Sequence, residues 1–230
     1  MFNELSAVLS ATPSDATRDG YAAAIIETNC LSKPTASTRR LSNQRIGELY
    51  ALDPAVQVFR VLRKLWDLDA SGRRLLAVCC ALARDPLLAA TAPSILALLP
   101  GDEFLRDPLK SSLRALVGDR LNEDVLDKVV RNAASSWTQS GHLEGRTLKK
   151  RRSVQATPVT AAFAAYLART AGFHGTEIFA SGWFAVLDAS RSAARTLALE
   201  AKRLGLIDLR MAGDVVELEV GRLTARVARA

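Results

Sequence analysis

The sequence predicts a mainly α-helical fold with helix-turn-helix or winged-helix-like parts and a β-hairpin near the C-terminus. Hydrophobic residues make up 49% of the 230 residues, enough to bury a large core. Alanine and leucine, which favour helices, are abundant. Apolar and polar residues alternate over 206–220 around the turn residues Ala212, Gly213 and Asp214, and such alternation is typical of a hairpin.

Capping residues, prolines and glycines set the expected order of the helices. A first helix begins after Ser14 or Asp15 and ends near Cys30, and a second takes Ser37 or Thr38 as its N-cap. Further helices are expected over 55–66, 71–83, 86–99, 103–117, 123–139, 158–171 and 190–204. The helices over 71–83 and 86–99 are apolar around most of their circumference, so we expect them to form the central core.

The chain is long enough for one large domain or two small ones. We expect an N-terminal helical half over 1–118, with a basic segment at 33–64, and a C-terminal half over 119–230; the two could also form one compact domain. The C-terminal half holds two helices that each end at a glycine before an extended segment, at 123–141 and 190–205. That order is the closing half of a winged helix, although helices followed by hairpins are also common elsewhere in α+β proteins.

Composition narrows the class of protein. The formal net charge of +7 attracts polyanions such as nucleic acid, although many basic proteins bind nothing acidic. The cysteine count is odd, and Cys79 and Cys80 are adjacent, so with Cys30 we expect three reduced thiols in a cytoplasmic protein. The N-terminus lacks the features of a secretory signal, and the longest apolar stretch is too short to span a membrane.

Motifs for catalysis are missing from the sequence. It contains no phosphate-binding loop and no nucleophile elbow, so we expect neither an enzyme nor a cofactor. His142 and His174 are the only histidines, and each lies in a glycine-bounded turn without metal ligands at a suitable spacing. We therefore expect two surface histidines and no metal site.

The first candidate nucleic-acid site lies in the basic segment 33–64. Asn43, Gln44 and Arg45 are residue types that pair with base edges in a major groove. Ser37 and Thr38, at a helix start, could donate hydrogen bonds to a phosphate. The cations expected to contribute to DNA binding here are Lys33, Arg39, Arg40 and Arg45. A solvated helix face explains the same pattern equally well.

The second candidate is the run 146–152, in which five of seven residues are basic. If the preceding helix is a recognition helix, its exposed face carries Lys128, Arg131, Asn132 and Ser135. The run would then be the wing, with Arg146, Lys149, Lys150, Arg151 and Arg152 along phosphates. A loose basic linker is the alternative.

A protein–protein adaptor is the second class of function that the sequence allows. Basic helical modules also dock acidic partners, and Trp137, Trp183 and Phe184 could anchor such an interface. The same aromatic side chains could equally well belong to the core.

Several diffuse motifs resemble a known family. They are the stretch from Asn29 to Arg40, Glu48-Leu49-Tyr50-Ala51-Leu52-Asp53-Pro54, Ala83-Arg84-Asp85-Pro86-Leu87-Leu88, and the turn from Trp137 to Leu143. Over about 29–220 the chain resembles the small A component of BREX bacteriophage-resistance systems. The resemblance implies an all-helical fold similar to the antitermination-factor type, with helix-turn-helix-like parts. It also implies binding of double-stranded DNA within a multi-component defence system, and it assigns a role to no individual residue.

Overall fold

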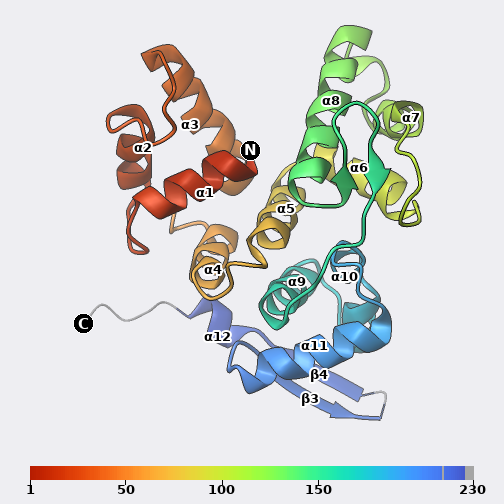
Figure 1. The fold of residues 1–230 in the computed structure, drawn as a ribbon. Coiled ribbons are helices and arrows are strands. Elements are labelled where there is room, and N and C mark those ends of the chain that lie inside the picture. The colour runs from red at the N-terminus through yellow and green to blue at the C-terminus, as the bar shows by residue number, and fades with distance from the viewer. Residues whose placement is uncertain (214, 226–230) are drawn as a thin grey trace.

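The computed structural model describes residues 1–213 and 215–225, and it confirms a mainly helical fold with a C-terminal hairpin (Figure 1). Helices α1 to α6 are Phe2–Ala11, Arg18–Ile26, Ala36–Tyr50, Gln57–Trp66, Arg73–Arg84 and Pro86–Leu96. Helices α7 to α12 are Arg106–Val117, Glu123–Gln139, Pro158–Thr170, Gly182–Ala185, Arg191–Arg203 and Gly221–Thr224. Two short 3-10 helices, η1 (Gly118–Arg120) and η2 (Gly175–Ala180), complete the helical part.

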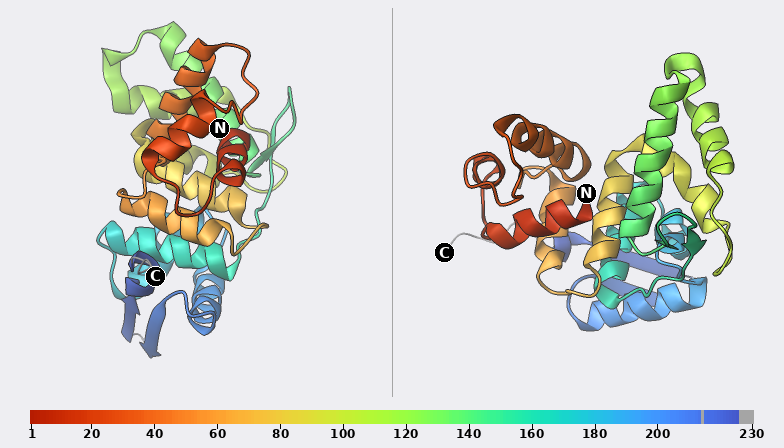
Figure 2. Two further views of the ribbon diagram at one scale, coloured as in Figure 1. Left: turned by 90° about the vertical axis from the view of Figure 1, so that its left-hand side faces the viewer. Right: turned by 45° about the horizontal axis from the view of Figure 1, so that its top comes forward.

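The helices form three groups. Helices α1, α2 and α3 pack together, as do α6, α7 and α8 (Figure 1). Helices α4 and α5 connect these groups, and α9 to α12 with the hairpin lie beyond α4 and α5 (Figures 1 and 2). The first two groups therefore stand on the same side of α5, and they face each other through α3 and α8.

The core is centred on α5 and α9. The helices over 71–83 and 86–99 were expected to form it; this is confirmed for the first, α5, and wrong for the second, α6. Ten consecutive residues of α9, from Val159 to Ala168, are buried, and α5 buries eight in a row from Leu75 to Leu82. Helix α6 instead buries only Leu88, Thr91 and Ile95. Helix α6 therefore lies at the edge of the core: one of its sides faces solvent, and the turn before it borders a groove.

Several helix ends follow the predicted caps. Asn122 caps α8 by accepting from the Val125 N–H at 2.9 Å, and Thr157 caps α9 by accepting from the Thr160 N–H at 3.1 Å. Helix α3 differs, because Thr35 is its N-cap and Thr38 lies in the first turn, where the two threonines form a reciprocal capping box. The prediction of Ser37 or Thr38 as the cap is therefore wrong. Helix α1 was not predicted.

Two antiparallel hairpins follow the helices α8 and α11. The first joins β1 (Leu143–Glu144) to β2 (Lys150–Arg151), and Lys150 also forms a bridge with Glu103, ahead of α7. The second joins β3 (Asp208–Ala212) to β4 (Val215–Glu219), in a register that runs from Asp208 opposite Glu219 to Ala212 opposite Val215. Within its predicted turn, Asp214 lies outside the described residues.

No helix among the described residues is long and apolar enough to cross a membrane. The three cysteines are free: Cys79 and Cys80 are fully buried, and Cys30 is half-buried against the core. Burial raises the pKa of the Cys79 and Cys80 thiols, so both are protonated and pack as small apolar groups.

Candidate nucleic-acid interface

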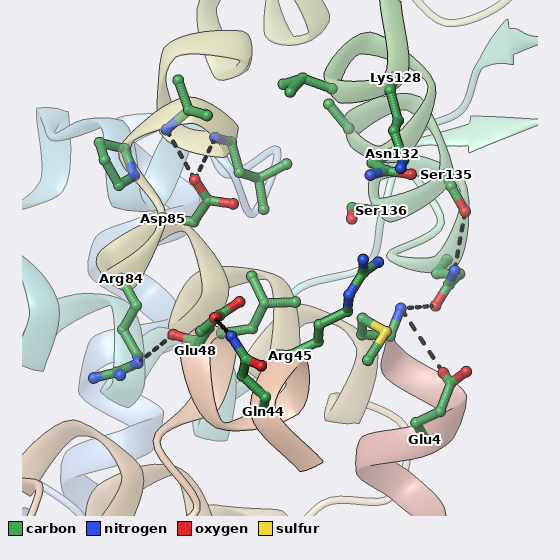
Figure 3. Close-up of a pocket in the computed structure, with 18 of the residues that line it drawn as sticks. Glu4, Gln44, Arg45, Glu48, Arg84, Asp85, Lys128, Asn132, Ser135 and Ser136 are labelled. Carbon is green, nitrogen blue, oxygen red and sulfur yellow. Dashed lines mark hydrogen bonds and ion pairs between the residues drawn. The ribbon is translucent and has the colours of Figure 1, made fainter. Parts of the chain in front are cut away.

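A groove of about 750 Å³ separates α3 from α8, and the turn between α5 and α6 forms its floor (Figure 3). It brings together polar residues from the two segments that sequence analysis singled out separately. Gln44 and Arg45 come from α3, whereas Lys128, Asn132 and Ser135 come from α8, more than 80 positions later. We call this hollow the α3–α8 groove.

Arg45 and Lys128 are the exposed cations that face each other across the α3–α8 groove. In Figure 3 the Arg45 side chain extends from α3 towards α8, where Lys128 and Asn132 lie. Among residues 1–213 and 215–225, neither cation has an ion-pair partner or a side-chain hydrogen bond. Both charges are therefore available to a ligand.

The groove also contains three carboxylates, so its formal side-chain charge is balanced. Glu4 lies 3.5 Å from the Lys33 Nζ, Glu48 accepts from the Gln44 Nε2 at 2.9 Å, and Asp85 accepts from the Leu87 and Leu88 N–H groups. Each carboxylate thus already has a donor within the protein. The third cation, Arg84, is also engaged, because its Nε donates to the Glu48 carbonyl at 3.1 Å.

Most other residues predicted in the basic segment lie outside the groove. Lys33 reaches Glu4, and Arg39 is half-buried and donates to the Ile26 carbonyl at 2.8 Å. The Thr38 hydroxyl donates to the Thr35 carbonyl, so it holds the helix end together. The remaining predicted positions, Ser37, Arg40 and Asn43, do not line the groove. Further along the segment, Arg63 is buried and donates to Asp67 at 2.7 Å.

On α8, Arg131 is separated from its three predicted companions. It borders a smaller hollow beside α7, together with Lys110 and Asp127. Lys110 lies 2.7 Å from both Glu123 and Asp127, so the acidic first turns of α8 are paired with α7. Hydrogen bonding and charge from Lys110 lower the pKa of Glu123 and Asp127, which keeps both ionised.

The basic run 146–152 divides into free and engaged cations because it folds into a hairpin. Arg146 and Lys150 are exposed and have no ion pair among the described residues. Lys149 donates to the Thr138 hydroxyl at 2.8 Å, and Arg152 pairs with Glu144 at 3.0 Å while remaining two-thirds exposed.

The buried position of Arg151 contradicts the prediction that its side chain lies along a phosphate. Its side chain is only 3% exposed, and it forms a buried ion pair with Asp188. Successive strand residues point to opposite faces, so Lys150 points outward and Arg151 inward. The Arg151–Asp188 pair joins the first hairpin to the segment after α10.

Two of the three aromatic residues proposed as interface anchors lie in the core. Trp137 and Phe184 are fully buried, and the Trp137 Nε1 donates to the Thr91 hydroxyl at 2.8 Å. Trp183 is half-buried and packs against the same core. Trp137 and Phe184 are therefore not available to anchor an interface with a protein partner, as the adaptor hypothesis requires.

His142 is fully buried, which corrects its prediction as a surface residue. Its Nε2 donates to the Val186 carbonyl at 2.7 Å, and its Nδ1 accepts from the Ser140 hydroxyl at 2.8 Å. The Trp137 ring packs edge-on, with 4.9 Å between centroids. Burial lowers the pKa of His142 to about 4, so the imidazole is neutral at pH 7. His174 is exposed, as predicted.

Acidification should destabilise the protein through His142. The pKa of His142 is about 4 in the folded state against about 6.5 when unfolded, so the unfolded state takes up a proton first as the pH falls. We expect the free energy of unfolding to drop by about 3 kcal/mol between roughly pH 6.5 and pH 4 from this residue. Urea titrations across that pH range measure the free energy of unfolding. The His142→Gln variant should show a flatter dependence of this free energy on pH. Equal pH dependence in both proteins would exclude His142 as the cause.

The floor of the groove is what sequence analysis missed. Arg84 and Asp85 belong to it only because α5 and α6 turn sharply there, and Arg84 reaches the end of α3. Their spacing in the sequence shows a helix end and an N-cap but nothing of their neighbours. No local signal identifies them as groove residues.

Among the described residues, no group of three or more histidines, cysteines or carboxylates is placed to hold a metal ion. No protein-family model matches the chain, and no curated protein or solved structure matches it.

Proposed function

We propose that the protein binds double-stranded DNA, chiefly through the phosphates, along the α3–α8 groove. The observation that carries this proposal is the convergence of Gln44, Arg45, Lys128 and Asn132 on one groove from two distant segments. Arg45 and Lys128 have no partner among the described residues, whereas each groove carboxylate has a donor. A phosphate between the two cations would give both a charge-assisted hydrogen bond. Asn132 and Gln44 would add neutral contacts.

The order of elements around α8 supports the same proposal. A bridge residue (Glu103), α7, α8 and the hairpin β1–β2 follow one another in the chain, and the hairpin pairs back with the bridge residue. This is the order of a winged helix-turn-helix, in which the last helix faces DNA and the hairpin is the wing. In this proposal Arg146 and Lys150 are the phosphate contacts of the wing, and Arg151 has a structural role instead.

The cellular setting of this DNA binding rests on the resemblance to the small A component of BREX systems. On that basis the protein is an accessory component of an anti-phage defence system that modifies host DNA, and it acts by binding rather than by catalysis. Sister components of the system would then be its protein partners.

The proposal is tested by titrating the purified protein into a fluorescent duplex across a salt series, with single-stranded DNA and RNA in parallel. Micromolar or tighter duplex binding that weakens steeply with salt is expected, because each neutralised phosphate releases counterions. The slope estimates how many phosphates are contacted. Absence of duplex binding at low salt would overturn the proposal. A salt-resistant and nuclease-resistant complex with another protein, without duplex binding, would support the adaptor alternative.

A further inference from the structure

The C-terminal group repeats the order of elements found around α8. Helix α9 packs along α11, and the hairpin β3–β4 follows α11 directly after Gly205. The inward face of the hairpin, Leu209, Val216 and Leu218, is buried against η2 and α11. Helix α11 thus occupies the place of a recognition helix, and it lies at the outer edge of the molecule (Figures 1 and 2).

The outward face of α11 is basic and polar around one exposed apolar side chain, that of Leu199. The buried residues Ala194, Ala198 and Ala201 face α9, and the small side chains allow the two helices to pack closely. Away from that side the helix carries four cations and two small hydroxyl residues: Arg191, Arg195, Lys202 and Arg203, with Ser192 and Thr196. The one carboxylate of α11 is Glu200.

Among the described residues the α11 cations have no protein partner, unlike Lys110 and Arg114 of α7. Arg191, Lys202 and Arg203 are exposed, and Arg195 is half-buried. None of the four side chains makes an ion pair or a hydrogen bond with another described residue. An unpaired positive surface of this kind attracts a polyanion, and the 13 residues of α11 extend over about 20 Å, which suits the major groove of a duplex.

The hairpin beside α11 carries the opposite charge. Its exposed side chains include Asp208, Glu217 and Glu219, and its one cation, Arg210, lies 3.9 Å from Glu217. Phosphates would be repelled by this face, so the hairpin cannot serve as a basic wing. Any contact with DNA in this group therefore comes from the helix.

We infer that α11 is a second DNA-binding surface, separate from the α3–α8 groove, which inserts into a major groove without phosphate contacts from β3–β4. This inference rests on the proposed function, since both surfaces bind the same class of ligand. Ser192, Thr196 and Arg203 share the outward face and are placed to contact base edges, while Arg191 and Lys202 flank them and contact phosphates.

The test is the duplex titration with the full-length Arg191→Glu/Arg203→Glu variant. Both side chains are exposed, and the two changes act oppositely on the α11 dipole, so the fold is preserved. We expect duplex affinity to fall at least about tenfold and the salt slope to become shallower by about 1, because only Arg191 of the two is placed on a phosphate. The matched control is Arg18→Glu/Arg106→Glu, which changes the net charge equally at exposed positions outside both surfaces. It should change the affinity by less than about threefold.

The outcomes distinguish DNA binding by α11 from DNA binding by the α3–α8 groove. Equal losses in the α11 variant and in its control would overturn the role of α11. An unchanged affinity in the α11 variant, together with a loss in an α3–α8 groove variant, would overturn it as well but leave the proposed function standing. A loss confined to the α11 variant would support α11 and exclude the α3–α8 groove.

Discussion

Replacing Arg151 with methionine is expected to lower the free energy of unfolding by about 3 kcal/mol. The change keeps most of the buried volume but leaves the Asp188 carboxylate without its cation. Asp188 keeps one hydrogen bond, from the Val154 N–H at 2.8 Å, and its side chain is 20% exposed, which holds the loss near the lower end of the range for broken buried pairs. Urea denaturation at pH 7 measures the loss.

Arg152→Met is the matched control for Arg151→Met. Arg152 is the next residue and also forms an ion pair, but it and Glu144 are both about two-thirds exposed. Its loss should cost less than about 1 kcal/mol. Adding Asp188→Asn to Arg151→Met should restore part of the stability, because the unpaired charge is then removed. Similar losses of unfolding free energy for Arg151→Met and Arg152→Met would show that the Arg151–Asp188 pair does not hold the hairpin β1–β2 against the segment after α10.

The double variant Arg45→Glu/Lys128→Glu should bind duplex DNA about 100-fold more weakly than the natural protein. Each reversal removes a charge-assisted hydrogen bond to a phosphate and adds repulsion, and a loss of about tenfold for each residue is the minimum expected. The loss should be similar for unrelated DNA sequences, because phosphates carry no sequence information. Fluorescence anisotropy at one fixed salt concentration measures both effects.

The control for the groove variant has the same change in charge. Arg18→Glu/Arg210→Glu alters exposed residues on α2 and β3, away from the α3–α8 groove. If binding responded only to the net charge, both double variants would weaken it equally. Such a result would contradict the assignment of the groove as the DNA site.

Local signals in the sequence were sufficient for most helices and for the second hairpin. The cap at Asn122 and the glycine at 141 define α8, and the alternation over 206–220 defines β3–β4, because these features act through neighbouring residues. Helix α1 was missed because it has no side-chain cap hydrogen bond to mark its start.

The roles of individual cations depend on contacts between distant residues, and sequence alone could not supply them. Arg151 looked like its neighbours in a basic run, but Asp188, 37 positions later, draws it inside. His142 looked like a turn residue, yet Val186 from the segment after α10 covers it. Gln44 and Lys128 were both predicted to contact DNA, and both are exposed, but their meeting across one groove follows from the packing of α3, α5 and α8.

The most decisive measurement is a photo-crosslinking experiment that tests whether bound DNA lies in the α3–α8 groove. A photo-crosslinker attached through Gln44→Cys, in a Cys30→Ser background, reports contact at the groove, since the remaining Cys79 and Cys80 are buried and should not be labelled. The same label at Arg18→Cys, on α2, is the control. The proposal predicts efficient crosslinking of a bound duplex from position 44 and only background yield from position 18. Equal yields from both positions, or none from position 44 while the duplex is bound, would contradict it.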